Sequence, residues 1–465
     1  MSSIRRTEEV SQMLRIGRVL GIVGLLMPFV VLGLPAPAHA DEPLTQLSSD
    51  PFTNVDGQHR TQVGSDSFQS GTTIFTAFQA GRGSGGGSAG VGYAAYSKQS
   101  RTWRTGFLDG ITVHRGGGQY GAVSDVKVAY CFNCYDMWLV SSLAINGPGG
   151  SSAIITSRTN NNGYSFFKPV VAVTGQVTKQ WLVCNYHPSG PCYLGYTVTN
   201  AGNALRMRMT TNGGLTWGPE RGTADNAAGF AGKPIVQQDG TVVVPYLATN
   251  GQIRSFRTTD RGESWQSSVL VSDVQRRATA GGLSTNALPS AQRDYYGTTY
   301  VAWSDCRFRS GCAANDIVWS RSTNGTSWTA PRRVPIDPTG STVDHFLPAI
   351  GVDPTSYTAE TTRIGLTYYY YPNANCTFAT CQLNVGFISS VNGGTTWGAP
   401  TRIAGPMNLS WLPSAGQGRT VGDYFATEVA WGGNAFPILS LASEPSSGTF
   451  NQAMYVPSAG LPLNG

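Results

Sequence analysis

The chain has 465 residues, of which only 12% are charged, and its formal net charge is +6 at pH 7. This small positive charge, without any run or stripe of Lys and Arg, argues against a nucleic-acid-binding surface. The 58 glycines, 20 tyrosines and 11 tryptophans instead indicate a β-rich chain of extracellular type.

The first 40 residues have the pattern of a secretory signal peptide. Arginines come first, an apolar run at positions 19–34 follows, and a Pro-Ala-Pro-Ala-His-Ala segment ends at Ala40. A transmembrane anchor is the alternative, but this run is shorter than the roughly 20 residues that span a bilayer. We expect cleavage after Ala40, a secreted protein, and no membrane attachment once the signal is removed.

A hairpin pattern, Ser/Thr-x-Asp/Asn-x-Gly-x-Ser/Thr-aromatic, recurs along the rest of the chain. Clear copies occupy residues 159–166, 210–217, 258–265 and 390–397, a shortened copy occupies 322–328, and a decayed copy occupies 97–103. In such a turn the Asp or Asn accepts hydrogen bonds from backbone N–H groups, and the glycine supplies a positive φ. Because the copies follow apolar strands, the pattern predicts an all-β fold built from repeated hairpins.

These hairpins resemble the Asp-box, or BNR, repeat of the sialidase-like superfamily, and the resemblance extends over residues 59–456. It implies one β-propeller at 41–465, in which each box joins the two outer strands of a blade on the face opposite the substrate pocket. A fainter repeat of short inner strands favours seven blades over six, and these strands begin near residues 59, 125, 179, 233, 288, 347 and 423. Residues 41–56 are expected to supply a closing strand of the last blade, because closure removes exposed sheet edges.

The eight cysteines occur as four close pairs: Cys131 with Cys134, Cys184 with Cys192, Cys306 with Cys312, and Cys376 with Cys381. In an exported chain this arrangement predicts four disulfides. Zinc binding and redox chemistry are the alternatives, but the one CxxC sequence has no second, suitably placed ligand pair. No dense cluster of metal ligands appears in the sequence, so we expect no metal and no cofactor.

One of these pairs encloses two arginines. Arg307 and Arg309 lie between Cys306 and Cys312, so a disulfide would hold both guanidinium groups on a tight loop. Such a loop is a candidate for binding an anion or a partner protein. The alternative is that Asp305 and Arg307 simply brace the loop.

The loops that lead into the inner strands carry the candidate functional residues. The ligand-binding candidates are Arg60, Asp125, Lys179, Trp181, Lys233 and His345, and the catalytic candidates are Asp344, Asp423, Tyr424 and Glu428. Aromatic faces stack on sugar rings, and charged groups bind hydroxyls or a carboxylate, so this mixture favours a glycan ligand. Tyr424 and Glu428 are a possible nucleophile pair, and Asp344 is a possible proton donor, with Asp423 as a second carboxylate. For any one of these residues the alternative is an ordinary solvated loop position.

The sequence departs from the family's enzymes in one respect. A sialidase grips its substrate's carboxylate with three arginines, the first in a Phe/Tyr-Arg-Ile-Pro string, whereas Arg60 here stands in Gln58-His59-Arg60-Thr61. The sequence therefore predicts a secreted, monomeric propeller that recognises glycans at its axial funnel. It leaves open whether the protein also hydrolyses them as an exo-sialidase-like glycoside hydrolase. The alternative is a non-catalytic propeller that binds extracellular protein or cell-wall partners.

Overall fold

The structure is a computed structural model that describes residues 41–465 except 148–149, 187–189, 231, 416–417 and 431–432. The predicted signal peptide at 1–40 lies outside the described residues. The part of the chain that is described consists of antiparallel strands and four short 3-10 helices: η2 (Thr199–Ala201), η3 (Ala280–Gly282), η4 (Ser310–Cys312) and η5 (Leu409–Trp411). None of the described helices is long and apolar enough to cross a membrane. The predicted all-β fold is confirmed.

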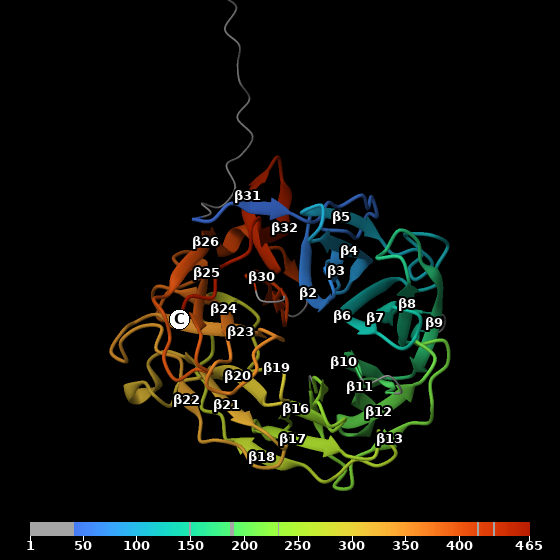
Figure 1. Cartoon of the computed structure of the whole chain (residues 1–465). Coiled ribbons are helices and arrows are strands. Elements are labelled where there is room, and N and C mark those ends of the chain that lie inside the picture. Colours follow the sequence, from blue (N-terminus) through green and yellow to red (C-terminus); the bar gives the residue numbers. More distant parts are fainter. Residues whose placement is uncertain (1–40, 148–149, 187–189, 231, 416–417, 431–432) are drawn as a thin grey trace, which may run out of the picture. The chain divides into compact units, whose positions relative to one another are not determined.

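The sheets follow one another in chain order around a central axis (Figure 1). The first is eight-stranded and consists of two four-stranded halves, which are joined at a single residue pair, Ser88 with Val123. The first half contains β2 (Gln62–Ser70), β3 (Thr73–Arg82), β4 (Ser88–Ser97) and β5 (Thr102–Phe107). The second half contains β6 (Ala122–Cys131), β7 (Met137–Ile145), β8 (Ala153–Thr159) and β9 (Phe167–Thr174).

Four further sheets continue in the same way. They contain β10 (Val177–Cys184), β11 (Cys192–Val198), β12 (Ala204–Thr210) and β13 (Arg221–Gly222); then β14 (Gly229–Phe230), β15 (Ile235–Val236), β16 (Val242–Ala248), β17 (Ile253–Thr258) and β18 (Val269–Ser272). The next contain β19 (Ser290–Arg293), β20 (Thr299–Asp305), β21 (Asp316–Ser322) and β22 (Arg332–Arg333); then β23 (Asp344–Val352), β24 (Ile364–Tyr371), β25 (Gln382–Ser390) and β26 (Thr401–Asn408). In the sheets of β10–β13, β19–β22 and β23–β26, the strand that comes first in the sequence lies closest to the axis (Figure 1).

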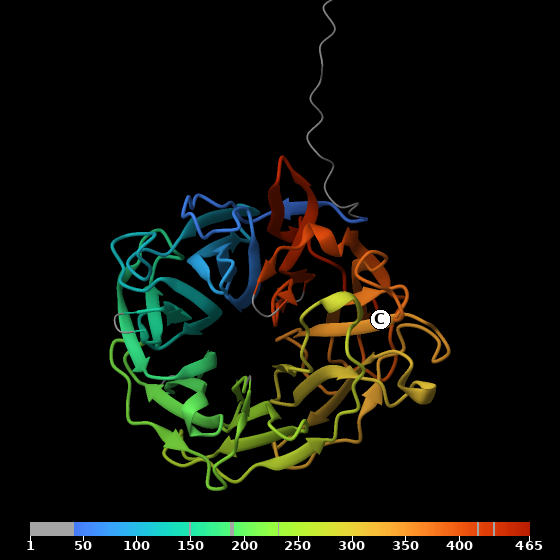
Figure 2. The same cartoon turned by 180° about the vertical axis from the view of Figure 1, so that it is seen from behind.

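The beginning of the described chain pairs with its end. After the hairpin of β27 (Ser414–Ala415) and β28 (Gly418–Arg419) come β29 (Thr427–Val429), β30 (Ala435–Pro437), β31 (Leu439–Ser446) and β32 (Thr449–Pro457). The strand β1 (Leu44–Gln46) pairs antiparallel with β32, and the two lie side by side in both views (Figures 1 and 2). Between β30 and β31, the N–H of Ile438 donates to the carbonyl of Ala426 at 2.9 Å, and β29 pairs with β30 in a separate two-stranded sheet.

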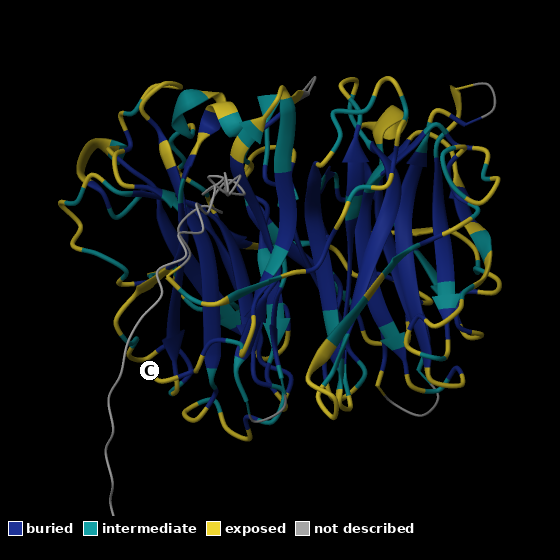
Figure 3. Ribbon diagram, turned by 90° about the horizontal axis from the view of Figure 1, so that it is seen from above, coloured by how far each residue is buried: buried dark blue, intermediate teal, exposed yellow. Residues whose placement is uncertain are grey.

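The hydrophobic core is divided into layers between neighbouring sheets. The strands are buried along most of their length, whereas the connecting loops at both ends are exposed (Figure 3). Between the first two groups of strands, for example, the ring of Phe75 stacks on Tyr93 at 5.6 Å and on Trp138 at 5.2 Å. Strands packed on both faces need continuous rather than alternating hydrophobicity, which matches runs such as residues 137–145.

The recurring hairpins share one hydrogen-bond pattern. In the copy at 210–217, the Thr210 hydroxyl donates to Asn212 Oδ1 at 2.9 Å and accepts from the N–H of Gly214 at 3.1 Å. Asn212 Oδ1 also accepts from the N–H of Thr216 at 3.0 Å. The same bonds recur in the copies at 159–166, 258–265 and 390–397. The pattern is therefore a set of local hydrogen bonds within the turn that joins two consecutive strands.

All eight cysteines are paired as predicted. Each disulfide closes a loop of only a few residues between two consecutive strands. The four bonds therefore restrain local turns and do not link one sheet to another.

Candidate functional site

A pocket lies where the innermost strands of several sheets meet. Its lining includes five of the predicted site residues, Trp181, Lys233, Asp423, Tyr424 and Glu428. These side chains come from β10, from the segment before β15, and from β29 with the residues just before it. Segments that are far apart in the sequence thus converge on one pocket, which we call the axial pocket.

Bulges in the innermost strands help to orient these side chains. Each of β2, β6, β10 and β23 shifts register once, and each shift contains a residue with positive φ: Gly64 (65°), Asp125 (47°), Lys179 (49°) and Leu347 (49°). A bulge bends a strand and redirects its side chains, and bulges are frequent beside active sites. For the residues other than glycine this backbone conformation costs on the order of 1 kcal/mol or more, so packing around it must hold it in place.

The bulges in β6 and β10 place two buried charges side by side. One carboxylate oxygen of Asp125 accepts from the N–H of Lys179 at 3.0 Å, and the other lies 3.5 Å from its ammonium nitrogen. The same ammonium group pairs with Asp423, which comes from the opposite end of the chain. Burial raises the pKa of Asp125, but the ammonium groups of Lys179 and Lys127 outweigh it and hold this pKa below its usual value.

Lys127 is a buried cation that the sequence analysis missed. Its side chain has no exposed surface, and its Nζ lies 3.6 Å from the ring centroid of Tyr424 and 4.1 Å from that of Trp181. Among the described residues, this Nζ has no hydrogen-bond partner. Burial lowers the pKa of Lys127 to about 8, although Asp66 and Asp125 oppose the shift. The signal in the sequence was a lysine within an otherwise apolar strand, Val126-Lys127-Val128.

Glu428 and Lys233 complete the axial pocket. Burial raises the pKa of Glu428 to about 8, with Lys233 opposing the shift, so the carboxyl group keeps its proton at neutral pH. Lys233 is partly exposed and forms no ion pair within the described part of the chain; its Nζ lies 5.3 Å from the ring centroid of Trp181. The rings of Trp181 and Tyr424 meet edge to face at 5.1 Å. The axial pocket thus offers a hydrogen-bond donor, a free ammonium group and aromatic surface.

The candidate nucleophile pair is only partly brought together. Glu428 lies in β29, whereas Tyr424 precedes this strand. The hydroxyl group of Tyr424 lies 3.5 Å from the carboxylate of Asp125. Burial raises the pKa of Tyr424 well above its usual value, which makes its phenolate hard to form at neutral pH.

The remaining candidates lie outside the lining of the axial pocket. Asp344 is fully buried at the start of β23, where the N–H and the side-chain amide of Asn315 donate to one of its oxygens at 2.7 and 2.8 Å. Burial raises the pKa of Asp344 and lowers that of the neighbouring His345 to about 4. Arg60 is exposed and donates to Asn451 at 2.9 Å.

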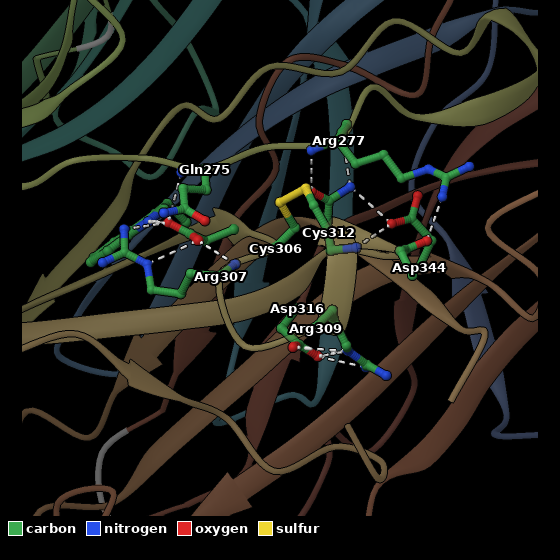
Figure 4. Close-up of a disulfide and its surroundings, with 12 residues drawn as sticks. Gln275, Arg277, Cys306, Arg307, Arg309, Cys312, Asp316 and Asp344 are labelled. Carbon is green, nitrogen blue, oxygen red and sulfur yellow. Dashed lines mark hydrogen bonds and ion pairs between the residues drawn. A yellow bond between two sulfur atoms is a disulfide. The ribbon is translucent and has the colours of Figure 1, made fainter. Parts of the chain in front are cut away.

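The loop closed by Cys306 and Cys312 is internally braced (Figure 4). Arg307 donates to Asp305 through its N–H at 2.9 Å and through its Nε at 3.0 Å. Arg309 makes a two-pronged contact with Asp316. Both arginines are therefore occupied by carboxylates of the chain itself, as the bracing interpretation expects.

A group of potential metal ligands next to this loop is also occupied. Asp316, Asp337 and His345 have oxygen and nitrogen atoms within 4.8 Å of one another. However, Arg309 and Arg333 each form ion pairs with both carboxylates. The carboxylates are thus neutralised by guanidinium groups, so the arrangement is an ion-pair cluster and does not fit a cation.

The comparisons with known proteins show the fold of this chain but assign it to no family. No protein-family model and no curated protein matches this chain. Among solved structures, a polysaccharide lyase, the PL25 ulvan lyase, has a TM-score of 0.52 at 12% identity, over 92% of this chain and 97% of the lyase. The NanB sialidase of Streptococcus pneumoniae has a TM-score of 0.44 at 11% identity, over 89% of this chain and 70% of that chain. The α-L-arabinofuranosidase Arb93A of Fusarium graminearum has a TM-score of 0.44 at 13% identity, over 81% of this chain and 99% of that chain. The ulvan lyase thus has the same fold over nearly its whole length.

Proposed function

We propose that this protein is a secreted β-propeller of the sialidase-like type and that it recognises a glycan in its axial pocket. The single observation that carries the proposal is the convergence of Trp181, Tyr424, Lys233 and Glu428 on one pocket. An aromatic ring can stack on the apolar face of a sugar, while a free ammonium group and a protonated carboxyl group bind its oxygen atoms. The fold shared with a polysaccharide lyase is compatible with this function.

We propose seven blades and a hairpin of Asp-box type in most of them. The supporting groups of strands are β2–β5, β6–β9, β10–β13, β14–β18, β19–β22, β23–β26, and β29–β32 together with β1. The pairing of β1 with β32 supports closure, because it joins the two ends of the described chain in one sheet. An experimental structure with six blades, or with a sandwich of sheets, would contradict this arrangement.

Binding is tested most directly with the Lys233→Met variant. The secreted protein is screened against a glycan library that includes uronic-acid, sialic-acid and neutral sugars, and affinities are measured by calorimetry. Loss of the Lys233 ammonium group, which forms no ion pair with any described residue, should weaken binding about 10- to 100-fold, as expected for a charge-assisted hydrogen bond. Lys168→Met, at an exposed position in β9, is the matched control and should bind normally. Equal affinity in both variants would place the glycan elsewhere.

Glycoside hydrolysis is a second candidate function. It is favoured by two carboxyl groups of the axial pocket, one of which is protonated and the other of which is in an ion pair. Glu428 keeps its proton at neutral pH, whereas Asp423 in the same pocket pairs with Lys179. Two carboxyl groups with separated roles are the usual requirement for this reaction. The protein should then release 4-methylumbelliferone from a sialic acid or another glycoside. Glu428→Gln should abolish turnover and leave binding largely intact, because the amide still donates a hydrogen bond but cannot transfer a proton.

Two results would favour the alternative function. If the wild type binds no glycan in the library and turns over no glycoside, the axial pocket is not a glycan site. A non-catalytic propeller that binds extracellular protein or cell-wall partners would then be the better hypothesis. Secretion is tested separately, by sequencing the amino terminus of the protein from the culture medium, which should begin at Asp41.

A further inference from the structure

Three exposed tyrosines, none of which lines the axial pocket, lie together on two turns of adjacent sheets. Tyr295 and Tyr296 lie between β19 and β20, and Tyr357 lies between β23 and β24. Their exposed fractions are 40%, 61% and 60%. The ring centroid of Tyr295 is 5.6 Å from that of Tyr296 and 5.1 Å from that of Tyr357. A single exposed aromatic residue is ordinary, but a contiguous group marks a binding surface. We call these three residues the tyrosine platform.

A buried carboxylate holds the two turns together. Asp294 is 1% exposed, and one of its oxygens accepts from the N–H of Thr298 at 2.9 Å within its own turn. Its other oxygen accepts from the hydroxyl of Thr362 at 3.3 Å, which lies at the end of the other turn. The rings are thus mounted on a braced base, and a surface that is ordered before binding loses less entropy when a ligand binds.

The chemistry of the platform fits an uncharged, hydroxyl-rich ligand. Between β19 and β20 (294–298) and between β23 and β24 (353–363), the charged side chains are those of the buried Asp294 and Asp353, of Glu360, and of Arg363, which pairs with Asp353 at 3.3 Å. Arg293, the last residue of β19, donates to the carbonyl oxygens of Asp294 and Tyr295 at 3.0 and 3.4 Å. Both guanidinium groups near the platform are therefore engaged within the protein and are not free to bind an anionic membrane, a nucleic acid or an acidic glycan. The two turns do present the rings of three tyrosines with their hydroxyl groups, and the exposed residues Thr358 and Thr361 lie beside them. Rings of this kind stack on sugars while their hydroxyl groups bond to sugar oxygens.

The orientation of the rings selects the form of the ligand. The ring of Tyr295 is inclined by 89° to that of Tyr296 and by 53° to that of Tyr357. Rings at such angles cannot lie together on the flat face of a crystalline polymer, but they can contact a single chain from different sides. We propose that the tyrosine platform binds a single chain of neutral polysaccharide, as a second glycan site that does not depend on the axial pocket.

Affinity gel electrophoresis tests this proposal with the full-length mature protein. Gels contain soluble glucomannan, mixed-linkage β-glucan or arabinoxylan as neutral polymers, or polygalacturonate as an acidic one. The variant Tyr296→Ala/Tyr357→Ala removes the two most exposed rings of the platform. Tyr164→Ala, which removes a 78% exposed tyrosine from the hairpin between β8 and β9, is the matched control. Thermal unfolding of all variants verifies that they are folded.

We expect at least one neutral polymer to retard the wild type and the Tyr164→Ala variant equally. The double variant should bind that polymer at least about tenfold more weakly, as expected for the loss of two central aromatic contacts. Retardation that is weakened by Lys233→Met and not by the double variant would instead assign this binding to the axial pocket and overturn the proposal. The proposal is overturned if no neutral polymer retards the wild type, or if the double variant is retarded as strongly as the wild type.

Discussion

Two buried groups of charges in this molecule are built in different ways. The loop cluster consists of Arg309, Asp316, Arg333, Asp337 and His345. The axial cluster consists of Asp125, Lys127, Lys179, Asp423 and Glu428. In the loop cluster each arginine pairs with both aspartates. In the axial cluster the Lys127 ammonium has no hydrogen-bond partner among the residues that the structure describes, and burial keeps the Glu428 carboxyl group protonated.

The difference separates a structural group from a functional candidate. Paired charges can brace a loop, but they have little left to offer a ligand. Unpaired or neutralised groups cost stability, and such costs persist in proteins mainly where a site needs them. The first three predictions below test this distinction, beginning with the largest expected effect.

Breaking the loop cluster should cause the largest loss of stability. In Arg309→Met, the buried Asp316 and Asp337 lose one of their two partners, and the carbonyls of Pro338 and Ser341 lose a donor. Removing one partner of a buried pair costs about 3–5 kcal/mol, which urea unfolding at pH 7 can measure. Arg402→Met removes a half-exposed pair with Asp41 and should cost less than about 1 kcal/mol. Equal losses in both variants would mean that burial does not distinguish the two pairs.

In the axial cluster, replacing Glu428 should increase stability at high pH, whereas breaking the loop cluster decreases it. The pKa of Glu428 is raised from 4.5 to about 8 in the folded protein, so between these pH values the folded state binds more protons than the unfolded state. The contribution of Glu428 to stability is therefore fully present below pH 4.5 and is lost as the pH rises through 8, at about 1.4 kcal/mol per pH unit.

The Glu428→Gln variant should lack this loss. At pH 9 it should be more stable than the wild type by a few kcal/mol, whereas the advantage should disappear near pH 4. Urea unfolding across this pH range measures the difference, and Glu263→Gln, at a position with a 60% exposed side chain, is the control. Parallel pH curves for the wild type and Glu428→Gln would contradict the raised pKa.

Replacing the unpaired lysine should increase stability. The pKa of Lys127 is lowered from 10.5 to about 8, so the unfolded chain binds more protons between these values, and wild-type stability rises with pH in this window. Lys127→Met should lack that rise and should gain about 1–3 kcal/mol at pH 7, since a buried charge is replaced by an apolar side chain. The same variant should weaken glycan binding, because the ammonium group supports the rings of Tyr424 and Trp181. A loss of stability at pH 7 would mean that this lysine is paired in solution.

The sequence could predict the features whose partners are close along the chain. In each hairpin of the repeat, the bonding groups lie within a few residues, so the pattern alone identified them. The same holds for the disulfides, of which the widest spans 8 residues. The arrangement of these hairpins and apolar strands was enough to predict an all-β fold.

The axial pocket could be predicted only in part, because its contacts are long-range. Lys179 and Asp423 were both candidates, but their pairing joins residues 244 positions apart and follows only from the arrangement of the sheets. Lys127 was missed because it lies within a strand and not in a loop. Asp344 was treated as a loop residue because an inner strand was expected near Leu347, whereas β23 begins at Asp344 itself.

The smallest expected loss of stability is in the hairpins of the repeat. They serve as a reference for the two clusters, because they contain residues of neither one. Thr210→Val removes the hydroxyl group that accepts from Gly214 and donates to Asn212, and should cost about 1 kcal/mol in urea unfolding. Leu215→Ala in the same turn, at a 53% exposed position, should change stability by less than about 0.5 kcal/mol. Neither change should affect binding in the axial pocket, because the hairpin is a local structural element. A binding defect in Thr210→Val without loss of stability would mean that the repeat itself contacts the ligand.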